Sequence, residues 1–456
     1  MHMHTNNSVH INKRTLIVGL GKTGLSCARF LAAQDVPLAI TDSRENPPAL
    51  DEMKELLPDV ALFVGGFDEA AFNAAEQVLV SPGVSVKEPM IAHARQRGVP
   101  VLGDIELFAR HVQSPVIAIT GTNGKSTVTM LIADMARRAG NEVCVGGNLG
   151  TPALDLLMEA DASEHKPDLY VLELSSFQLE TTSSLNAVAA VVLNVSTDHM
   201  DRYTNTEEYA AAKARVYQNN GVMIINADDP VVNRMAITDR TIIRFGLNPP
   251  DAGDFGLQII DGEAWLSRGD EPWLPESGLK LAGRHNTANA LAALALGTAV
   301  NLPKVAMLES LRNFTGLPHR CQWVTEHEGV NWYNDSKATN VGAAIASITG
   351  MSGQLVLIAG GDAKHADFSA LKDAVANRVR NAVLIGRDAG MLEKALDGVV
   401  PVVYATDMVD AVTKARQLAT KGDSVLLAPA CASFDMYSGF EQRGEVFMQA
   451  VREVAA

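Results

Sequence analysis

A glycine-rich segment carries a lysine and hydroxyl side chains in an order suited to binding a nucleoside triphosphate. Residues 121–127 read Gly-Thr-Asn-Gly-Lys-Ser-Thr, between a strand-like apolar run and a helix-like run. In that setting backbone N–H groups wrap the phosphates, Lys125 neutralises the β- and γ-phosphate oxygens, and the Ser126 hydroxyl reaches Mg²⁺. Because Ile119 stands where the pattern G-x-x-x-x-G-K-[ST] has its first glycine, we predict a shortened phosphate loop. A plain turn would leave Gly-Lys-Ser unexplained.

Acidic and histidine side chains follow two further strand-like runs. Glu173 ends one run, and Asp198, His199 and Asp201 follow the next. Since the carboxyl ends of parallel strands meet at one edge of a sheet, we expect these groups beside the phosphate loop. A buried acid is costly unless it is paired or binds a metal. We therefore predict a metal or substrate role for Glu173 and His199, with a structural histidine as the alternative.

A second glycine turn reads Gly19-Leu-Gly-Lys-Thr-Gly24, and Asp42 ends the strand-like run after it. Glycines at this spacing let the backbone approach a pyrophosphate at a helix N-terminus, which is typical of dinucleotide sites. The pattern specifies a diphosphate rather than a nicotinamide, because Ser43 and Arg44 could hold a uracil or a phosphate equally well. A tight turn without a ligand is the alternative.

Two lysines differ in what their neighbours imply. Lys337 lies in residues 334–340, Asn-Asp-Ser-Lys-Ala-Thr-Asn, which we expect to open a helix. The helix dipole disfavours a cation in a first turn, so this lysine indicates an anion nearby. Lys213 lies in the helix-like run 207–217, where its spacing from upstream glutamates is that of a solvated cation.

The apolar runs that position these residues alternate with helix-like runs, which is typical of parallel sheets covered by helices. We predict an α/β protein of three domains, because 456 residues allow about three domains of roughly 150 residues each. The expected domains are a Rossmann-like parallel sheet (1–104), a P-loop ATPase domain with a small antiparallel part (105–316), and a second Rossmann-like parallel sheet (317–456). The Gly-, Pro- and Asp-rich stretch 242–273 would supply the antiparallel strands.

Composition argues against several classes of partner. The 38 lysines and arginines against 53 aspartates and glutamates give a formal net charge of −15, unlike a general nucleic-acid or anionic-membrane binder. No apolar run approaches the roughly 18–20 residues of a membrane span, and the polar N-terminus has no signal-peptide core. We therefore expect a cytoplasmic protein without nucleic-acid binding or membrane insertion. The four cysteines form no C-x-x-C pair and are expected to be reduced.

Taken together, several of these strings resemble the Mur ligases, from Gly19 to the C-terminal end. The string 334–340 is similar to that of the members that add D-glutamate, and the Asp-Asn-Pro-Arg motif of the diaminopimelate-adding relatives is absent. The other matching strings are residues 121–127, Asp-His-Met-Asp-Arg-Tyr (198–203), Gly-Arg-His-Asn-x-x-Asn (283–289), Leu-Pro-His-Arg (317–320), Ser-Pro-Gly (81–83), Gly-Gly-Asn (146–148), Gly-Gly-Asp-x-Lys (360–364) and Phe-Glu-Gln-Arg-Gly (440–444).

The resemblance implies three domains that bind UDP, ATP and the incoming amino acid, in that order. It implies ATP-dependent amide formation between the L-alanine carboxyl of UDP-N-acetylmuramoyl-L-alanine and the amine of D-glutamate, in the cytoplasmic stage of peptidoglycan synthesis. The carboxylate would attack the γ-phosphate to give an acyl phosphate, which the amine then attacks. ATP and Mg²⁺ are the implied cofactors, and a monomer is expected.

The resemblance also implies roles for individual residues. The catalytic set is Lys125, Glu173, His199 and Lys213, and the Mg²⁺ ligands are Ser126, Glu173, His199 and, if carbamylated, Lys213. ATP contacts are expected at Gly121, Thr122, Asn123, Gly124, Lys125, Ser126, Thr127, Asn286, Asn289, Arg320, Asp335 and Lys337. Contacts to the UDP substrate are expected at Leu20, Lys22, Ser43, Arg44, Ser81, Pro82, Gly83, Asn148 and His199. D-Glutamate contacts are expected at Thr339, Lys364, Ser433, Phe434 and Phe440.

Three positions depart from the family pattern and affect contact details rather than the reaction. Lys22 stands where an uncharged residue is common, Ser43 where threonine is, and Phe434 where leucine is. We hypothesise that the larger ring of Phe434 tightens the D-glutamate pocket.

Three other functions explain fewer of these residues. An NAD-dependent oxidoreductase would explain the first glycine turn and Asp42, but neither the Gly-Lys-Ser loop nor Lys337. A folylpolyglutamate synthase-like enzyme or another Mur-type ligase would share the phosphate loop but not the string 334–340. A non-enzymatic nucleotide-binding module would leave the carboxylates and lysines at three strand ends unexplained.

Overall fold

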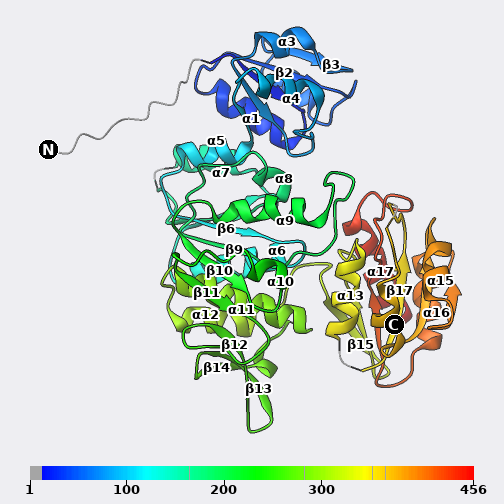
Figure 1. Cartoon of the computed structure of the whole chain (residues 1–456). Coiled ribbons are helices and arrows are strands. Elements are labelled where there is room, and N and C mark those ends of the chain that lie inside the picture. The colour runs from blue at the N-terminus through cyan, green and yellow to red at the C-terminus, as the bar shows by residue number, and fades with distance from the viewer. Residues whose placement is uncertain (1–12, 164, 282, 352, 365, 456) are drawn as a thin grey trace.

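The structure, a computed structural model, describes residues 13–455 apart from 164, 282, 352 and 365. It contains three sheets, each covered by helices, and the three parts follow one another along the chain (Figure 1). The first part lies above the second, and the third lies beside the second (Figure 1). In the described part of the chain no helix has the length and apolarity needed to cross a membrane.

The N-terminal sheet is parallel, with five strands in the order β3-β2-β1-β4-β5. The predicted parallel sheet is confirmed, and the edge strand β3 is an addition whose residues are mostly exposed. Its apolar central strands are buried because helices cover both faces. The elements are β1 (Thr15–Val18), α1 (Lys22–Ala32), β2 (Leu38–Asp42), α2 (Leu50–Leu56), β3 (Ala61–Val64), α3 (Glu69–Ala74), β4 (Gln77–Val80), α4 (Pro89–Gln96), β5 (Val101–Leu102) and the following α5 (Asp104–His111).

The central sheet has nine strands in the order β14-β13-β12-β11-β10-β9-β6-β8-β7. Strands β6 to β11 pair in parallel, whereas β13 pairs antiparallel with both β12 and β14, which confirms the small antiparallel part. The elements are β6 (Val116–Thr120), α6 (Lys125–Arg138), β7 (Val143–Gly147), α7 (Ala153–Ala162), β8 (Leu169–Glu173), α8 (Ser176–Leu179), β9 (Ala189–Val192), α9 (Thr206–Ala214), β10 (Val222–Asn226), α10 (Pro230–Asn233), β11 (Ile242–Phe245), β12 (Phe255–Ile260), β13 (Glu263–Arg268), β14 (Glu271–Pro275), α11 (Arg284–Ala299) and α12 (Lys304–Asn313).

The C-terminal sheet has six strands in the order β15-β16-β20-β17-β18-β19. Five are parallel as predicted, and β15 joins the edge antiparallel to β16. The direction of β15 follows from the two-residue turn Glu328-Gly329, where both φ angles are positive, as a tight hairpin requires. The elements are β15 (Gln322–His327), β16 (Val330–Asn334), α13 (Val341–Gly350), β17 (Leu355–Gly360), α14 (Leu371–Ala376), β18 (Val379–Ile385), α15 (Ala389–Leu396), β19 (Val402–Tyr404), α16 (Met408–Leu418), β20 (Ser424–Leu427) and α17 (Phe440–Ala455).

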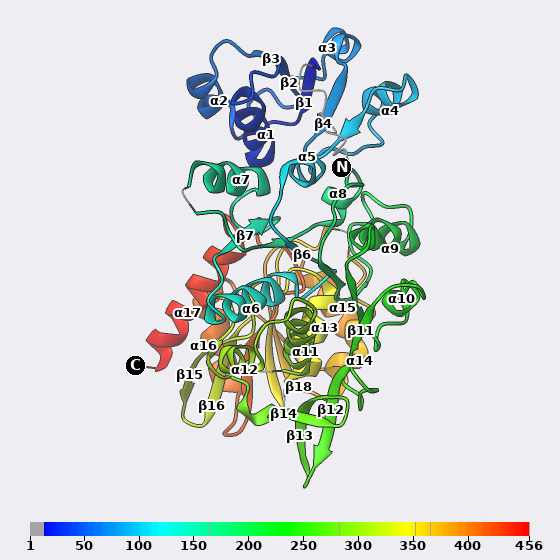
Figure 2. The ribbon, with the colours of Figure 1, turned by 90° about the vertical axis from the view of Figure 1, so that its left-hand side faces the viewer.

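Helix α1 of the N-terminal domain packs against helix α7 of the central domain (Figure 2). The Asp155 carboxylate is buried and accepts hydrogen bonds from Ser26 Oγ at 2.7 Å and Arg29 Nη2 at 2.8 Å. Lys22 Nζ donates to the Gly150 carbonyl at 2.7 Å. Lys22, which stands where the family commonly has an uncharged residue, therefore contributes a contact between the N-terminal and central domains.

The segment between α12 and β15 connects the central and C-terminal domains. Gly316, His319 and Cys321 in this segment have positive φ, and only the first is a glycine. The same pair of domains is also linked by hydrogen bonds from Arg320 Nη2 to Ser126 Oγ and from Asn340 Nδ2 to Asp198 Oδ2. The domain limits at 104/105 and 316/317 stay predictions.

The expected helix start around Lys337 is wrong. Helix α13 begins at Val341, with the Asn340 side chain accepting from the Ala343 N–H as its N-cap. Lys337 therefore precedes the helix, and the argument from the dipole of a first turn does not apply to it.

Candidate active site

The phosphate loop runs from the end of β6 to the start of α6 and is braced from the neighbouring strand. Gly121 and Gly124 have positive φ, and a Cβ on Gly124 would lie 2.4 Å from Asn289 Oδ1. Asn194, just after β9, accepts from the Asn123 N–H at 2.8 Å and donates to its carbonyl at 3.1 Å. Lys125 Nζ donates to the Gly121 carbonyl at 2.9 Å. Glycine is thus needed here for both conformation and space.

A chain of hydrogen bonds joins four predicted site residues at the start of α6. Ser126 Oγ donates to Glu173 Oε2 at 2.5 Å and accepts from Arg320 Nη2 at 2.7 Å. Asn148 Nδ2 donates to the other Glu173 oxygen at 2.7 Å. The carboxylate is buried at the end of β8, as the sequence predicts. The chain reaches from the central domain into the C-terminal one.

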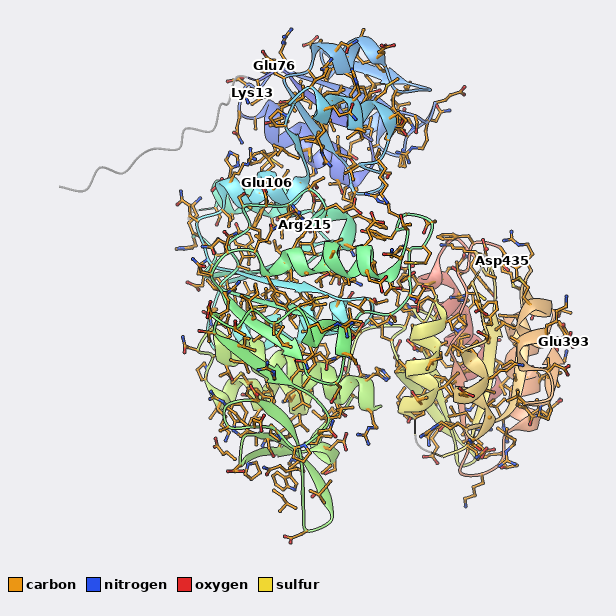
Figure 3. All side chains as sticks on the ribbon, viewed as in Figure 1. Lys13, Glu76, Glu106, Arg215, Glu393 and Asp435 are labelled. Carbon is orange, nitrogen blue, oxygen red and sulfur yellow. The ribbon has the colours of Figure 1, made fainter. Side chains whose placement is uncertain are left out.

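Lys213 is buried, contrary to the solvated cation that its helical spacing favours. It is 1% exposed, donates to the Gly121 carbonyl at 2.9 Å, and lies 4.4 Å above the Tyr209 ring. Burial and then repulsion from Lys125 hold the pKa of the Lys213 amine well below its usual range. The lowered pKa favours the neutral amine, which is the form that reacts with CO₂. Its neighbour Arg215, labelled in Figure 3, donates to the carbonyl of Leu179 at 2.7 Å.

His199 packs among aromatic rings beside Asp198. The ring packs edge-on against Phe177 at 4.8 Å, and Nε2 lies 3.8 Å from Asp198 Oδ2. Burial lowers the pKa of His199, although Asp198 opposes the shift. In the described part of the chain no three His, Cys, Asp or Glu side chains are placed to share a metal ion. Of the predicted ligands, Ser126 and Glu173 are hydrogen-bonded to each other, whereas the contacts of His199 are with Phe177 and Asp198.

The residues expected on ATP from the C-terminal domain cluster around Arg320. The carboxylate of Asp335 accepts from the Cys321 N–H at 3.2 Å and from the Ser347 hydroxyl, and burial raises its pKa. Burial and then repulsion from Arg320 lower the pKa of Lys337 to about 8. Its Nζ lies 3.8 Å above the Phe440 ring.

The expected adenine contacts lie together on α11. Asn289 Nδ2 donates to Asn286 Oδ1 at 3.2 Å, and Asn289 faces Gly124 of the phosphate loop. The helix thus places Asn289 beside the phosphate loop and Asn286 against Asn289.

The five residues expected on D-glutamate lie on loops that follow the parallel strands of the C-terminal sheet, and at the start of α17. Lys364 Nζ lies 5.6 Å from the centre of the Phe434 ring, which is 66% exposed. Ser433 is buried, and Phe440 lies beneath Lys337. The Thr339 N–H donates to the carbonyl of Lys337 at 2.7 Å. Thr339 and Phe440 therefore contact Lys337, one of the residues expected on ATP.

The first glycine turn is closed by Asp42 rather than left open to a ribose. Asp42 accepts from the Leu20 N–H at 2.7 Å and from Arg44 Nη2 at 2.6 Å. Burial alone would raise the pKa of this carboxyl, but the bonds from Arg44 and Leu20 lower it. Ser81 Oγ donates to the Gly19 carbonyl at 2.7 Å, so the Ser81–Gly83 loop lies beside the turn. Since its oxygens are occupied, Asp42 lacks the free acceptors that an NAD ribose needs.

Sequence reasoning missed three residues of this site. Asn194 braces the phosphate loop, Tyr209 covers Lys213, and Arg202 joins the Ser81–Gly83 loop to the His199 segment. Arg202 Nη1 donates to the carbonyl of Pro82 at 3.0 Å. Asn194 directly follows a strand, and Arg202 lies inside a quoted string, so position gave a signal for both. Nothing in the local sequence marks Tyr209.

Family models match three consecutive parts of the chain. They are described as the MurD-like N-terminal domain of Mur ligases over residues 13–103, the Mur ligase middle domain over 119–297, and the glutamate ligase domain of Mur ligases over 319–431. Solved structures with a similar fold include a pseudomurein peptide ligase type C from Methanothermus fervidus (TM-score 0.59, 18% identity, 97% of this chain and 100% of that one) and MurF from Acinetobacter baumannii (TM-score 0.58, 17% identity, 96% and 92%).

Curated relatives match nearly the whole chain. A protein of Nitrosococcus oceani is 57% identical over 442 residues, with 96% of each chain covered. One from Pseudomonas putida is 51% identical over 444 residues, covering 96% of this chain and 97% of its own. Both are named UDP-N-acetylmuramoylalanine–D-glutamate ligase. With all three domains matched in order and such identity over its length, the chain belongs to the Mur ligase family.

Proposed function

We propose that the protein joins D-glutamate to UDP-N-acetylmuramoyl-L-alanine in an ATP-dependent amide ligation of peptidoglycan synthesis. The relatives that carry this name are 50–57% identical to the chain over almost their whole length. The observation that carries the proposal is the hydrogen-bonded chain Glu173–Ser126–Arg320, because it joins a phosphate loop to groups from a second domain.

In the first step, a carboxylate oxygen of the L-alanine forms a bond to the γ-phosphorus while the bond to the β-phosphate oxygen breaks. ADP leaves and an acyl phosphate forms. Like charges meet in this step, so positioning and positive charge lower its barrier. Lys125, Arg320 and Lys337 are the cations that would face the phosphates, while Asn286 and Asn289 would hold the adenine.

Ser126 and Glu173 fit a Mg²⁺ ion, because a hydroxyl and a carboxylate, both hard oxygen donors, lie together at the start of α6. When bound, the ion would neutralise phosphate charge. His199 and Lys213, if carbamylated, complete the proposed ligand set. The burial of Lys213 favours the neutral amine that carbamylation requires.

In the second step, the amine of D-glutamate forms a bond to the acyl carbon, and the tetrahedral intermediate expels phosphate as the amine loses its proton. Lys364, Thr339, Ser433, Phe434 and Phe440 are proposed to hold the amino acid, with the Lys364 ammonium facing its side-chain carboxylate. The UDP substrate would lie on Leu20, Lys22, Ser43, Arg44, Ser81, Pro82 and Gly83, and reach Asn148 and His199.

The proposal includes the division of labour among domains. Residues 1–104 would bind UDP, 105–316 ATP and 317–456 the amino acid, in a cytoplasmic monomer. Because ATP and amino-acid residues come from different domains, we expect closure around the substrates.

The test is phosphate release from ATP in the presence of UDP-N-acetylmuramoyl-L-alanine. Parallel samples contain D-glutamate, L-glutamate, L-lysine, meso-diaminopimelate or no amino acid, each with Mg²⁺. Release with D-glutamate alone is expected. Release with another amino acid would overturn the substrate assignment but keep the ligase, and no release from folded protein would overturn the ligase itself.

A further inference from the structure

Arg443 is a buried cation for which the proposed reaction has no role. It lies in the first turn of α17 and is 1% exposed. Burial removes the charge from water, and the positive end of a helix dipole disfavours it further. Burial lowers the pKa of Arg443 to about 10, so the side chain keeps its proton at neutral pH. A residue held against both costs needs a strong set of partners.

The partners of Arg443 are uncharged oxygens. Nη2 donates to the Ser336 carbonyl at 2.8 Å, and Nε donates to the Ser336 hydroxyl at 3.0 Å. Nη1 donates to the carbonyls of Cys431 at 3.2 Å and Ala432 at 3.3 Å, with Gly360 at 3.5 Å. The planar guanidinium, with five donors in a fixed fork, satisfies this arrangement, and an ammonium does not.

These acceptors belong to three different loops at the carboxyl edge of the C-terminal sheet. Ser336 follows β16, Gly360 ends β17, and Cys431 follows β20. Asp435, labelled in Figure 3, marks the last of these loops on the upper side of the domain. The loops are packed tightly around the guanidinium, since a Cβ on Gly361 would lie 3.3 Å from Nη1.

Each loop also carries residues expected on a substrate. Ser336 stands between Asp335 and Lys337, which are expected on ATP. Lys364 follows the second loop, and Ser433 and Phe434 follow the third. One side chain therefore contacts the loop that carries residues expected on ATP and the two loops that lead to residues expected on D-glutamate.

We propose that Arg443 is a positioning residue that holds these three loops in register, so that D-glutamate and ATP phosphate groups are presented to each other. The inference rests on the proposed function. It predicts that loss of the guanidinium fork weakens D-glutamate and ATP binding but leaves binding of the UDP substrate intact, because that substrate is assigned to another domain.

The test compares Arg443→Lys, which keeps the charge, with Arg380→Lys as a matched control. Arg380 is in the same domain and donates to Asp423 at 2.9 Å and 3.3 Å, away from these loops. We expect Arg443→Lys to raise the KM for D-glutamate by about tenfold or more, and to raise the KM for ATP, with the KM for the UDP substrate within about twofold. The control should change none of the three.

Amide hydrogen exchange on both variants separates positioning from folding and does not depend on ligase activity. Faster exchange in Arg443→Lys confined to residues 336–340, 360–364 and 431–434 is expected. Exchange that becomes faster throughout the domain would overturn the positioning role of Arg443. Unchanged exchange in these loops together with unchanged KM values would overturn it as well. If wild-type protein shows no D-glutamate-dependent turnover, the proposed function fails, and the exchange pattern still decides whether Arg443 holds the loops.

Discussion

Arg320 and Ser126 are 194 residues apart in the chain, yet a guanidinium nitrogen of the first lies 2.7 Å from the hydroxyl of the second. The same hydroxyl donates to Glu173. A cation from the C-terminal domain therefore lies directly on the residue expected to sit beside the nucleotide phosphates. In the proposed complex, the ATP phosphates would share or replace Ser126 as the acceptor of Arg320.

We predict that Arg320→Ala raises the KM for ATP. A hydrogen bond to a charged group contributes about 1.5–3 kcal/mol, which corresponds to roughly ten- to a hundredfold in kcat/KM for ATP. The KM for ATP of Arg320→Lys should lie between those of the wild type and Arg320→Ala, since lysine keeps the charge but lacks the planar set of guanidinium donors. Steady-state kinetics measure this, with the exposed Arg312→Ala on α12 as the control. An unchanged ATP dependence in Arg320→Ala would contradict the assignment.

Lys213→Met should be folded and inactive. Methionine fills the buried site without a charge, so the thermal midpoint should be kept or raised, whereas no carbamate can form. In the wild-type protein the lowered pKa of Lys213 favours a carbamate, and ¹³C NMR with ¹³CO₂ should show its carbonyl carbon. Activity in Lys213→Met at the wild-type level would exclude the metal-ligand role.

The KM for ATP should rise as the pH passes about 8. The pKa of Lys337 is lowered to about 8, so the free enzyme loses this charge above that pH. ATP favours the protonated form, and binding above pH 8 must therefore be accompanied by proton uptake. Lys337→Arg stays charged and should flatten the profile. Calorimetry in buffers of different ionisation enthalpy measures the uptake, and equal heats in all buffers at pH 8.5 would refute it.

Sequence patterns predicted those features whose cause is local. Gly124, Lys125 and Ser126 lie on a strand–loop–helix unit, and Glu173 ends a buried strand, so periodicity and loop chemistry place them correctly. All of them lie at the same sheet edge because parallel strands share their direction.

The remainder depends on groups that are distant in sequence. Lys213 has the spacing of a surface lysine, and only the packing of Tyr209 and the Gly121 loop buries it. The closure of Asp42 by Arg44 depends on side-chain direction, which a glycine fingerprint does not specify. For Lys337, the asparagine that caps α13 three residues later moved the helix start.

Asp155→Asn should loosen the N-terminal domain from the central one. The carboxylate is buried and accepts from Ser26 and Arg29, so its loss should cost about 1–3 kcal/mol of unfolding free energy. Denaturant unfolding measures this change. Asp161→Asn is the matched control, because the Asp161 pair with Lys166 lies on the surface and should matter little. An equal loss of unfolding free energy in both variants would show that the buried Asp155 contact between α1 and α7 stabilises the protein no more than a surface ion pair does.

The connection between α12 and β15 bends through left-handed residues on both sides of Arg320, at His319 and Cys321. The side chain that contacts Ser126 is thus borne by the joint between domains rather than by either sheet. A nucleotide bound to Arg320 would therefore hold this connecting segment in place and restrict movement of the two domains relative to each other. Protease cleavage near Gly316 would then report occupancy of the nucleotide site.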